Sequence, residues 1–357
     1  MAEGLSRRRV CTPRETDEGV ASVNSTQSPE LHRMQSSDEA KTDKVPLLTL
    51  MEETLLLGLK DQEGYLSFWN DSLSYVLRGC MLMELAFRRR IRISKDAFTG
   101  MTGISERPIE VISARATGEV LLDEALKVIK ASETRRTVAS WMDLLSGETW
   151  NIAKAGYQLK QVRERLAKGL VDKGILRTEK RNFLLFDMAT HPVQDPRAKD
   201  EVILRLFDTL NLPRTAATPT RAAQPGSMSS DAASYARFVG MGVGGQAGKL
   251  RMAPITNSRF YKNEESSRFA LLRRVCLVAA ACAGSVVENP LIHMDMETRD
   301  RAVSRAEDLM DVYGRWPFKR ESALFSPEID SGEAGDLMVE EVIASVVYVL
   351  RKMDKLI

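Results

Sequence analysis

Residues 70–87 read NDSLSYVLRGCMLMELAF, and this stretch predicts a long helix with one buried face. Its apolar residues recur at every fourth position, at Leu73, Leu77, Met81 and Leu85. Residues four apart in an α-helix share a face, so this stripe is expected to face the core. Asn70 or Asp71 is expected to cap the first turn. Arg78 follows the stripe by one residue and is expected on its flank.

Helical patterns also dominate the chain on either side of this stretch. Thr49 is expected to cap a helix that begins at Leu50, and Gly147 to close one over residues 135–145. Apolar periodicity predicts further helices over residues 120–130, 157–172, 267–287, 297–313 and 337–353. Residues 91–111 alternate apolar and polar residues and indicate short strands and loops. The predicted fold class is mainly α, a single globular helical domain with short strands.

A protruding β-hairpin is expected after the tight turn Lys173-Gly174. Its arms are predicted at residues 175–178 and 183–186, where apolar residues gather. The polar run over residues 179–182, which contains Lys180 and Arg181, is predicted to be the turn between them.

Composition sets two segments apart from the rest. Residues 1–44 are polar and have few large apolar side chains, so they cannot bury enough surface to offset the entropy of ordering. They are predicted to be a disordered arm before a helical domain over residues 45–357. Within that domain, residues 212–263 are rich in Gly and Pro and lack periodicity, which predicts a flexible insertion. Its basic residues are Arg214, Arg221, Arg237, Lys249, Arg251, Arg259 and Lys262, against one acid, Asp231.

Length and charge exclude several classes of protein. The chain has 357 residues and a formal net charge of +2, so basic recognition must come from local clusters. Its most apolar run, residues 277–287, is shorter than the ~20 residues that a transmembrane helix needs. Arg7-Arg8-Arg9 is not followed by an apolar segment, so no signal peptide is predicted. The protein is expected in the cytosol, where it can still sit on a membrane.

No residue set predicts catalysis, a metal or a cofactor. The four cysteines and three histidines are scattered, without a CxxC pair. The glycine-rich run that ends at Lys249 is no phosphate loop, because Val243 replaces the first glycine and Leu250 the final hydroxyl. The carboxylate pairs are adjacent in sequence and therefore diverge on a helix, so solvated faces or helix-dipole partners are expected instead. These pairs are Glu52-Glu53, Asp123-Glu124 and Glu340-Glu341.

A candidate anion-binding site combines an aromatic residue with three cations. Trp69 precedes the helix that carries Arg78, and Lys160 and Arg163 are three residues apart on another predicted helix, so both project from one face. Taken singly, a tryptophan is more often a core residue, and two cations are more often a solvated face. Together they could surround a phosphate, with Trp69 at the level of lipid headgroups. Spacing does not establish that the two segments meet.

A winged-helix protein that binds nucleic acid is the alternative. A basic helix, the turn at Lys173-Gly174 and a hairpin tipped by Lys180-Arg181 fit a module that places a helix in the major groove. Against this alternative, the near-neutral charge lacks the usual basic footprint, and Trp69 has no role in such a module.

Several long runs resemble the Golgi phosphoprotein 3 family. The match is dense over residues 45–195. It includes LLTLMEE at 47–53, FWND at 68–71, LRGCM at 77–81, TGEVLLDEALK at 117–127, LLSGETWN at 144–151, VRERLAK at 162–168 and NFLLFDM at 182–188. The resemblance implies a mainly helical, non-enzymatic protein that is peripheral to the cytosolic face of Golgi membranes. The basic insertion and the C-terminal third depart from the family's pattern.

The resemblance also implies ligands, partners and site residues. It implies binding of phosphatidylinositol 4-phosphate by Trp69, Arg78, Lys160 and Arg163, with no cofactor. It implies that Arg7, Arg8 and Arg9 bind the COPI coat, and that the protein tethers cytoplasmic tails of Golgi glycosyltransferases to that coat. It further implies a homo-oligomer that associates through the hairpin, and no nucleic-acid partner. The hairpin residues concerned are Ile175, Leu176, Phe183, Leu184, Leu185 and Phe186.

Overall fold

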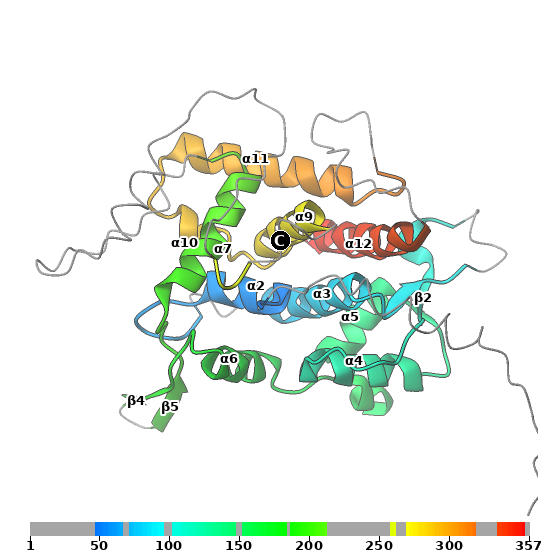
Figure 1. The fold of residues 1–357 in the computed structure, drawn as a ribbon, viewed down its shortest axis with the longest axis horizontal. Coiled ribbons are helices and arrows are strands. Elements are labelled where there is room, and N and C mark those ends of the chain that lie inside the picture. The colour runs from blue at the N-terminus through cyan, green and yellow to red at the C-terminus, as the bar shows by residue number, and fades with distance from the viewer. Residues whose placement is uncertain are drawn as a thin grey trace, which may run out of the picture. The chain divides into compact units, whose positions relative to one another are not determined.

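The computed structural model describes residues 47–66, 71–95, 102–147, 152–183, 186–212, 258–261, 269–318 and 334–353. These residues are mainly helical, which confirms the predicted fold class (Figure 1). The helices are α2 (Leu50–Gly58), α3 (Asp71–Phe87), α4 (Val120–Ala131), α5 (Val138–Ser146), α6 (Val162–Asp172), α7 (Pro196–Thr209), α9 (Ala270–Ala283), α10 (Glu288–Leu291), α11 (Met296–Tyr313) and α12 (Ala334–Met353), with 3-10 turns η2 (Ile104–Glu106) and η3 (Ile152–Tyr157).

The described strands are short and form small antiparallel sheets, as expected. β1 (Ile91–Ile93), β2 (Pro108–Val111) and β3 (Arg136–Thr137) lie in that order in one sheet. In it, Ile91 pairs with Val111 and Ile109 with Arg136. β4 (Glu179–Phe183) and β5 (Phe186–Thr190) form a separate hairpin beyond α6 (Figure 1).

The helices pack in layers, with α2 and α3 in the middle. In Figure 1, α9 and α12 lie on one side of this pair, and α4, α5 and α6 on the other. α11 covers α9 and α12, while α7 packs against α2 and α9. The core therefore runs along α3, which has neighbours on both sides.

The apolar stripe predicted in α3 is buried, as expected. Leu73 is 1 % exposed, and Leu77, Met81 and Leu85 are fully buried. Burial extends around the rest of the helix as well, since Val76, Cys80 and Met83 are also inaccessible. A helix that is apolar on all sides belongs in a protein interior, and this one is enclosed by the layers above and below it. Arg78, expected on the flank, is only 3 % exposed.

The start of the described chain is fixed by three separate elements. Thr49 caps α2 in a capping box with Glu52, which confirms its predicted role. The amide of Leu47 donates to the carbonyl of Phe260 at 3.2 Å. The carbonyl of Leu47 accepts from Lys173 at 2.9 Å, and that of Leu48 accepts from Arg273 at 3.1 Å. We call residues 47–49 the entry segment.

The boundaries of α5 and α6 depend on residues with left-handed backbones. Gly147 ends α5 with φ of 83°, as predicted from the glycine. The helix predicted over residues 157–172 begins later, at Val162. The reason is that Gln161 has φ of 53° and ψ of 38°, a conformation that no helix continues through.

The hairpin register differs from the prediction. Glu179 pairs with Thr190 and Phe183 with Phe186, so residues 179–183 are a strand and not the turn. The connection falls on residues 184–185, which lie outside the described residues. A two-residue connection is the commonest in hairpins, and a hairpin that stands away from the core needs no apolar arm. Leu176 continues the ladder through an isolated bridge to Val193.

Helix α7 was absent from the prediction. Its sequence signal was present, because Asp195 caps it and Pro196 occupies its first turn. Its buried residues include Ala198, Val202 and Leu206. The predicted arm over residues 1–44 and most of the predicted insertion at 212–263 lie outside the described residues, so both remain predictions. Within the insertion, Ser258–Tyr261 is described and is packed against the domain.

Candidate functional site

Arg78 joins three parts of the fold that lie far apart in sequence. Its Nε donates to the carbonyl of Leu145 at 3.1 Å, and its Nη2 to the carbonyl of Leu159 at 2.8 Å. Its Nη1 bonds the carbonyl and hydroxyl oxygens of Ser74, one turn earlier on α3, at 2.9 and 2.8 Å. The guanidinium therefore ties α3 to the end of α5 and to the segment that leads into α6.

The local sequence explains why these carbonyls are available. Leu145 is in the last turn of α5, where carbonyls have no partner within the helix. A cation at this end also faces the negative pole of the helix dipole. The amide of Leu159 donates to the same carbonyl of Leu145 at 3.1 Å. Arg78 and Leu159 therefore meet at one point, directly before Lys160.

Arg163 is in the first turn of α6, whereas Lys160 precedes the helix, so the prediction that both project from one helical face is wrong; the left-handed backbone of Gln161 separates them. Lys160 is exposed and Arg163 is partly exposed. Val162 and Leu166 are buried against the domain, and Arg163, three residues before Leu166, lies at the edge of this buried face. Among the described residues no carboxylate forms an ion pair with Lys160 or Arg163, whereas Arg165 on the same helix pairs with Glu124 at 2.5 Å.

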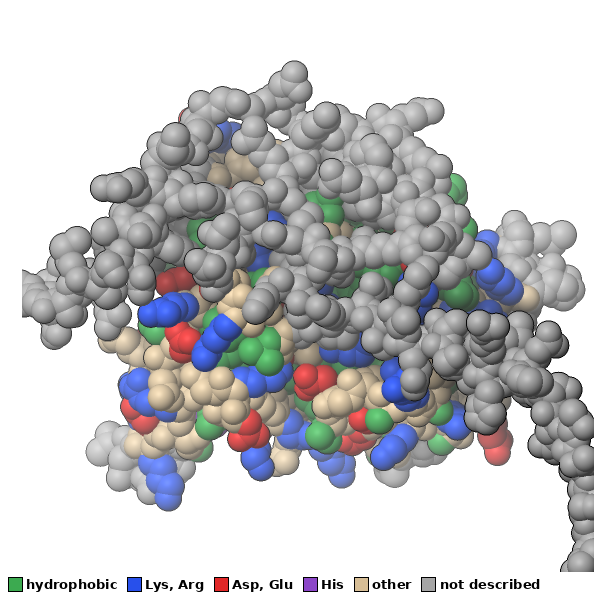
Figure 2. All heavy atoms as spheres, in the orientation of Figure 1, with side chains coloured by type: hydrophobic (Ala, Val, Ile, Leu, Met, Phe, Trp, Pro, Cys, Tyr) green, Lys and Arg blue, Asp and Glu red, His purple; other side chains and the backbone are tan. Residues whose placement is uncertain are grey.

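This end of α6 has the physical properties of an anion site. The first amides of a helix lack internal acceptors, and the helix dipole adds partial positive charge there. Arg163 adds a full charge in the first turn of α6, and Lys160 adds a second one two residues before the helix begins. Basic side chains also project along the described surface over α4 and α6 in Figure 2, with acidic ones among them. Positive charge is thus concentrated at this end of α6, although the net charge of the whole chain is only +2.

The structure brings some of the predicted site residues together. The chain at Arg78 and the chain at Lys160 meet, which spacing left open. Arg78 acts from within the protein, because its guanidinium donates to backbone carbonyls and to Ser74. Arg78 is therefore a buried residue that contacts the segment directly before Lys160, and its expected part in holding a phosphate stays a prediction. Trp69 and the arginine cluster at residues 7–9 lie outside the described residues.

Two of the six residues predicted for self-association are buried within the domain. Ile175 is fully buried and Leu176 is 1 % exposed. Both side chains anchor the base of the hairpin in the domain and are not on its surface. Of the remaining predicted residues, Leu184 and Leu185 lie outside the described residues, and the side chains of Phe183 and Phe186 are not described.

Lys180 and Arg181 lie within β4 and not at the hairpin tip. The winged-helix alternative required them at the tip. The observed register therefore contradicts the basic hairpin tip on which this alternative was based.

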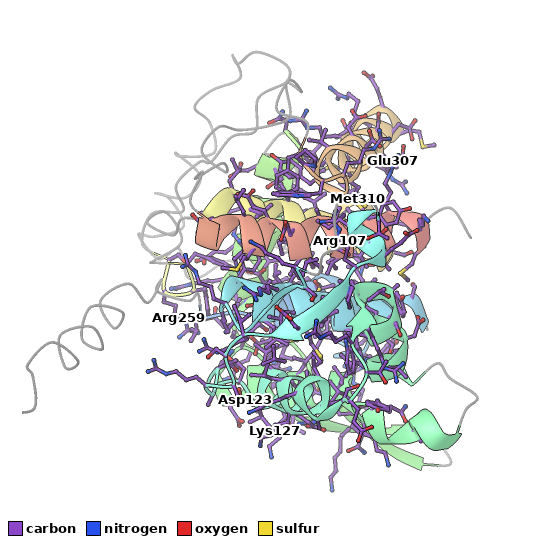
Figure 3. The ribbon with its side chains drawn as sticks, turned by 90° about the vertical axis from the view of Figure 1, so that its right-hand side faces the viewer. Arg107, Asp123, Lys127, Arg259, Glu307 and Met310 are labelled. Carbon is purple, nitrogen blue, oxygen red and sulfur yellow. The ribbon has the colours of Figure 1, made fainter. Side chains whose placement is uncertain are left out.

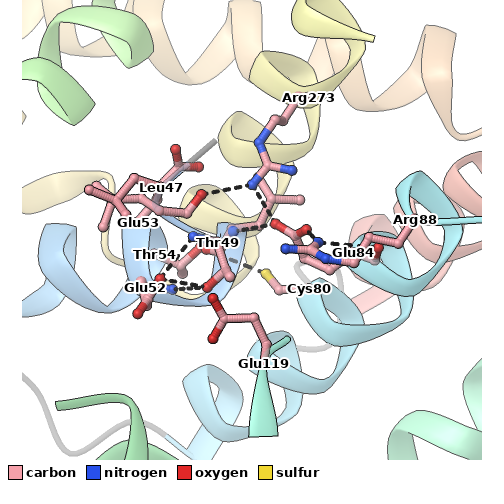
Figure 4. Close-up of polar contacts among 12 residues, drawn as sticks. Leu47, Thr49, Glu52, Glu53, Thr54, Cys80, Glu84, Arg88, Glu119 and Arg273 are labelled. Carbon is pink, nitrogen blue, oxygen red and sulfur yellow. Dashed lines mark hydrogen bonds and ion pairs between the residues drawn. The ribbon is translucent and has the colours of Figure 1, made fainter. Parts of the chain in front are cut away.

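The carboxylate pair Glu52-Glu53 is in the first turn of α2, where a helix-dipole partner was expected, but it is not a solvated face. Glu52 is 2 % exposed and Glu53 is fully buried. Lys173 lies 2.8 Å from Glu52, and Arg205 lies 2.5 Å from Glu53. Burial raises the pKa of Glu52, while the charge of Lys173 acts in the opposite direction. Figure 4 shows Glu52 and Glu53 beside the entry segment.

A buried charge network at Glu84 was also missed. Glu84, fully buried in the middle of α3, accepts from Arg273 on α9, from Arg88, and from the amide of Leu50 at 2.7 Å (Figure 4). Burial, followed by the charge of Arg273, lowers the pKa of Arg88 to about 10. No sequence pattern marks this cluster, because Glu84 and Arg273 are far apart in the chain. The network holds α2, α3 and α9 together.

The described residues offer neither a metal cluster nor a membrane span. No group of three or more His, Cys, Asp or Glu side chains is placed to hold a metal ion in the part of the chain that the structure describes. No helix in that part has the length and apolar character needed to cross a membrane.

His191 is partly buried, and this burial lowers its pKa.

The described residues form a mainly helical protein with two cations, Lys160 and Arg163, at and just before the start of α6. The sequence model of the Golgi phosphoprotein 3 (GPP34) family matches residues 50–343. The chain is also 41 % identical over 379 residues to vacuolar protein sorting-associated protein 74 of Schizosaccharomyces pombe, covering all of both chains. It is 40 % identical over 371 residues to the protein of the same name from Eremothecium gossypii, covering 99 % of each.

The chain belongs to the Golgi phosphoprotein 3 family. This membership confirms the resemblance seen over residues 45–195, whereas the match as far as residue 343 corrects the expectation that the C-terminal third departs from the family's pattern. The family is one of adaptors and not of enzymes, which agrees with the expectation that the protein has no catalytic activity.

Proposed function

We propose that the protein is a peripheral Golgi adaptor. It binds phosphatidylinositol 4-phosphate on the cytosolic face of the membrane and links cytoplasmic tails of glycosyltransferases to the COPI coat. Family membership and the named relatives, which are sorting proteins, support this role. The observation that carries the lipid site is the bond from Arg78 to Leu159, which fixes the chain directly before Lys160.

Lys160 and Arg163 are proposed to contact the phosphate directly. Both stand where the free amides of α6 begin, and neither forms an ion pair with a carboxylate among the described residues. A phosphomonoester brings about 1.5 to 2 negative charges and several acceptor oxygens, so charge-assisted hydrogen bonds from both side chains are favourable. Val162 and Leu166 pack α6 against the domain, so the helix presents Arg163 from a rigid support, while the bond from Arg78 to Leu159 holds the segment that carries Lys160.

Arg78 is proposed to favour lipid binding indirectly, by holding the segment that carries Lys160 in place. It holds the carbonyls of Leu145 and Leu159 and thereby sets the position of Lys160. Trp69 is proposed to border the same site at headgroup level, a role that rests on the family resemblance. Fixing the segment in advance reduces the conformational entropy lost on binding.

The other contacts are proposed to be individually weak. Arg7, Arg8 and Arg9 would bind the coat, client tails would bind elsewhere on the domain, and the hairpin tip would join copies of the protein. Weak contacts on one molecule reinforce each other through effective concentration, provided that all can be made together. Stable attachment to the Golgi then requires lipid, coat and client at one place.

Vesicle flotation tests the lipid site. Phosphatidylcholine vesicles that contain phosphatidylinositol 4-phosphate are compared with vesicles in which phosphatidylserine supplies equal charge. The wild type is expected to float with the former, and Lys160→Ala/Arg163→Ala to lose about tenfold or more in affinity. Lys168→Ala, another exposed cation on α6, is the matched control and should bind as the wild type does.

An equal loss of vesicle affinity in Lys168→Ala would mean that general surface charge, and not a specific site, causes the binding. Unchanged binding by Lys160→Ala/Arg163→Ala would refute the assignment of the site.

A further inference from the structure

A four-residue segment from the basic insertion is docked on α7. Ser258-Arg259-Phe260-Tyr261 is described, while residues 213–257 before it and 262–268 after it lie outside the described residues. The segment is close to the entry segment through the bond between Leu47 and Phe260. It therefore has contacts of its own with the domain, which can be considered residue by residue.

The two aromatic residues are the anchors of this segment. Phe260 is 2 % exposed and Tyr261 is 3 % exposed. The guanidinium of Arg205 lies over the ring of Tyr261, 4.0 Å from its centroid. Arg205 is held in turn by Glu53, at 2.5 Å. Buried aromatic side chains in contact with an arginine are the features that dominate the energy of many peptide and protein contacts.

The polar residues of the segment meet acids of α7. Arg259 lies 2.7 Å from the carboxylate of Asp195, the cap of the helix. The hydroxyl of Ser258 donates to Glu201 at 2.5 Å and accepts from the amides of Phe260 and Tyr261 at 3.0 and 2.9 Å. Ser258 thus closes a tight turn that presents both rings to the domain. Figure 3 shows Arg259 at the edge of the molecule.

The described recognition elements lie in four consecutive residues. They comprise a hydroxyl that shapes a turn, a cation that faces an acid, and two aromatic anchors that join the buried apolar cluster of the domain. Side chains of α7 contact Ser258, Arg259 and Tyr261, and the amide of Leu47 bonds the carbonyl of Phe260. This is the arrangement of a short peptide bound to a folded surface, and it is separate from the cations at the start of α6.

We propose that the face of α7 formed by Asp195, Glu201 and Arg205 is a peptide-binding site, and that Ser258–Tyr261 is its resident ligand. The site takes a peptide in which a hydroxyl residue and a basic residue precede two aromatic residues. A partner protein with such a segment competes with the chain's own copy. Because the resident segment is tethered, its effective concentration is high, and a partner gains access only when it binds more tightly or is abundant nearby.

The test empties the site and supplies the segment as a separate molecule. Phe260→Ser/Tyr261→Ser in the full chain removes both anchors. A fluorescent peptide with the sequence of residues 255–264 is added, and binding is measured by anisotropy. The peptide is expected to bind this variant and not the wild type at the same concentration. A peptide that carries the same two serines should not bind.

Further variants show whether the acids of α7 recognise the peptide. Asp195→Asn/Glu201→Gln, added to the emptied variant, should weaken binding by about tenfold, since a charge-assisted bond and an ion pair are lost. Glu297→Gln/Asp300→Asn removes two exposed acids from α11 and is the matched control. It should leave peptide binding unchanged.

A loss of stability in the emptied variant provides a second measurement. The peptide should then raise the melting temperature of the variant as its concentration increases, because a ligand that binds only the folded state stabilises it. Absence of both binding and thermal rescue would overturn the proposal and make the segment an integral part of the core. Binding that is equal in the wild type, or that ignores Asp195 and Glu201, would overturn it as well.

Discussion

Arg273 on α9 donates to the carboxylate of Glu84, in the middle of α3, and both side chains are buried. Removing Arg273 takes one charge-assisted hydrogen bond from the buried carboxylate of Glu84, which keeps Arg88 and the amide of Leu50 as partners. Arg273→Met is therefore expected to lower the free energy of unfolding by about 1.5–3 kcal/mol. Urea denaturation measures this change.

A surface pair provides the control for this prediction. Arg315 pairs with Asp311 at 2.5 Å, but its side chain is 49 % exposed. Arg315→Ala should cost less than about 1 kcal/mol. Equal losses in Arg273→Met and Arg315→Ala would mean that burial does not set the importance of the Glu84 network.

Arg78 should affect stability and lipid binding together. Arg78→Ala removes the donors to the carbonyls of Leu145 and Leu159, which is expected to cost about 1–3 kcal/mol. The same change frees the Lys160 segment and should weaken binding to phosphatidylinositol 4-phosphate vesicles. Lys160→Ala should weaken lipid binding while changing stability by no more than about 0.5 kcal/mol, because its side chain is exposed.

Arg78→Lys separates charge from geometry. Lysine keeps the positive charge but cannot reach Leu145, Leu159 and Ser74 together. If Arg78→Lys matches the wild type in flotation and in urea denaturation, the positioning role is wrong.

The raised pKa of Asp200 on α7 predicts that the stability of the protein depends on pH. Burial, with the charge of Asp61 as the next cause, raises the pKa of its carboxyl from 3.8 to about 6. The folded protein therefore holds this proton over a pH range in which the unfolded chain has lost it. The contribution of Asp200 to the free energy of unfolding consequently falls as pH rises from about 4 to about 6.

Asp200→Asn should remove this loss. We expect the variant to be more stable than the wild type by about 1–2 kcal/mol near pH 7, with little difference near pH 4, where both side chains are neutral. Urea denaturation at both pH values measures the difference. Glu307→Gln on the exposed side of α11 is the control (Figure 3). A stability difference that does not change with pH would contradict the prediction.

Alanine substitutions at two glycines can separate the cost of steric overlap from the cost of backbone strain. Gly64 has φ of 70°, and a Cβ there would lie 2.3 Å from the backbone nitrogen of Pro192. Gly118 has φ of 86° and no atom within 4 Å of such a Cβ. Gly118→Ala should cost about 1–2 kcal/mol from the left-handed conformation alone. Gly64→Ala should cost about 3 kcal/mol or more, because backbone must also move.

Thermal or urea denaturation of both glycine variants checks this ranking. Equal losses at the two positions would show that the turn at Gly64 can move away from Pro192 without cost.

The features predicted from sequence were those that depend on neighbours along the chain. The stripe from Leu73 to Leu85 fixed the position of α3, and the glycine at residue 147 marked the end of α5. Both depend on periodicity or on one residue's backbone preference. α7 had comparable signals at Asp195 and Pro196, which were overlooked.

The features that were missed depend on partners remote in sequence. Glu52 and Glu53 look like a solvated pair until Lys173 and Arg205 arrive from α6 and α7. Likewise, Arg78 looks like an exposed cation until the carbonyl of Leu159 is placed beside it. The hairpin register was wrong because apolar residues were assigned to the arms, although this hairpin is outside the core. The pattern of neighbouring residues does not show which remote residues will lie beside them in the fold.

The entry segment has a mechanical consequence if the protein acts as the adaptor proposed above. Tension applied to the chain before Leu47 does not pull on α2 alone. It is shared at once with Lys173 at the end of α6, with Arg273 on α9 and with Phe260, through the backbone bonds of Leu47 and Leu48. These contacts must rupture before the load can unwind the first turn of α2, so residues 47–49 resist traction as a clamp.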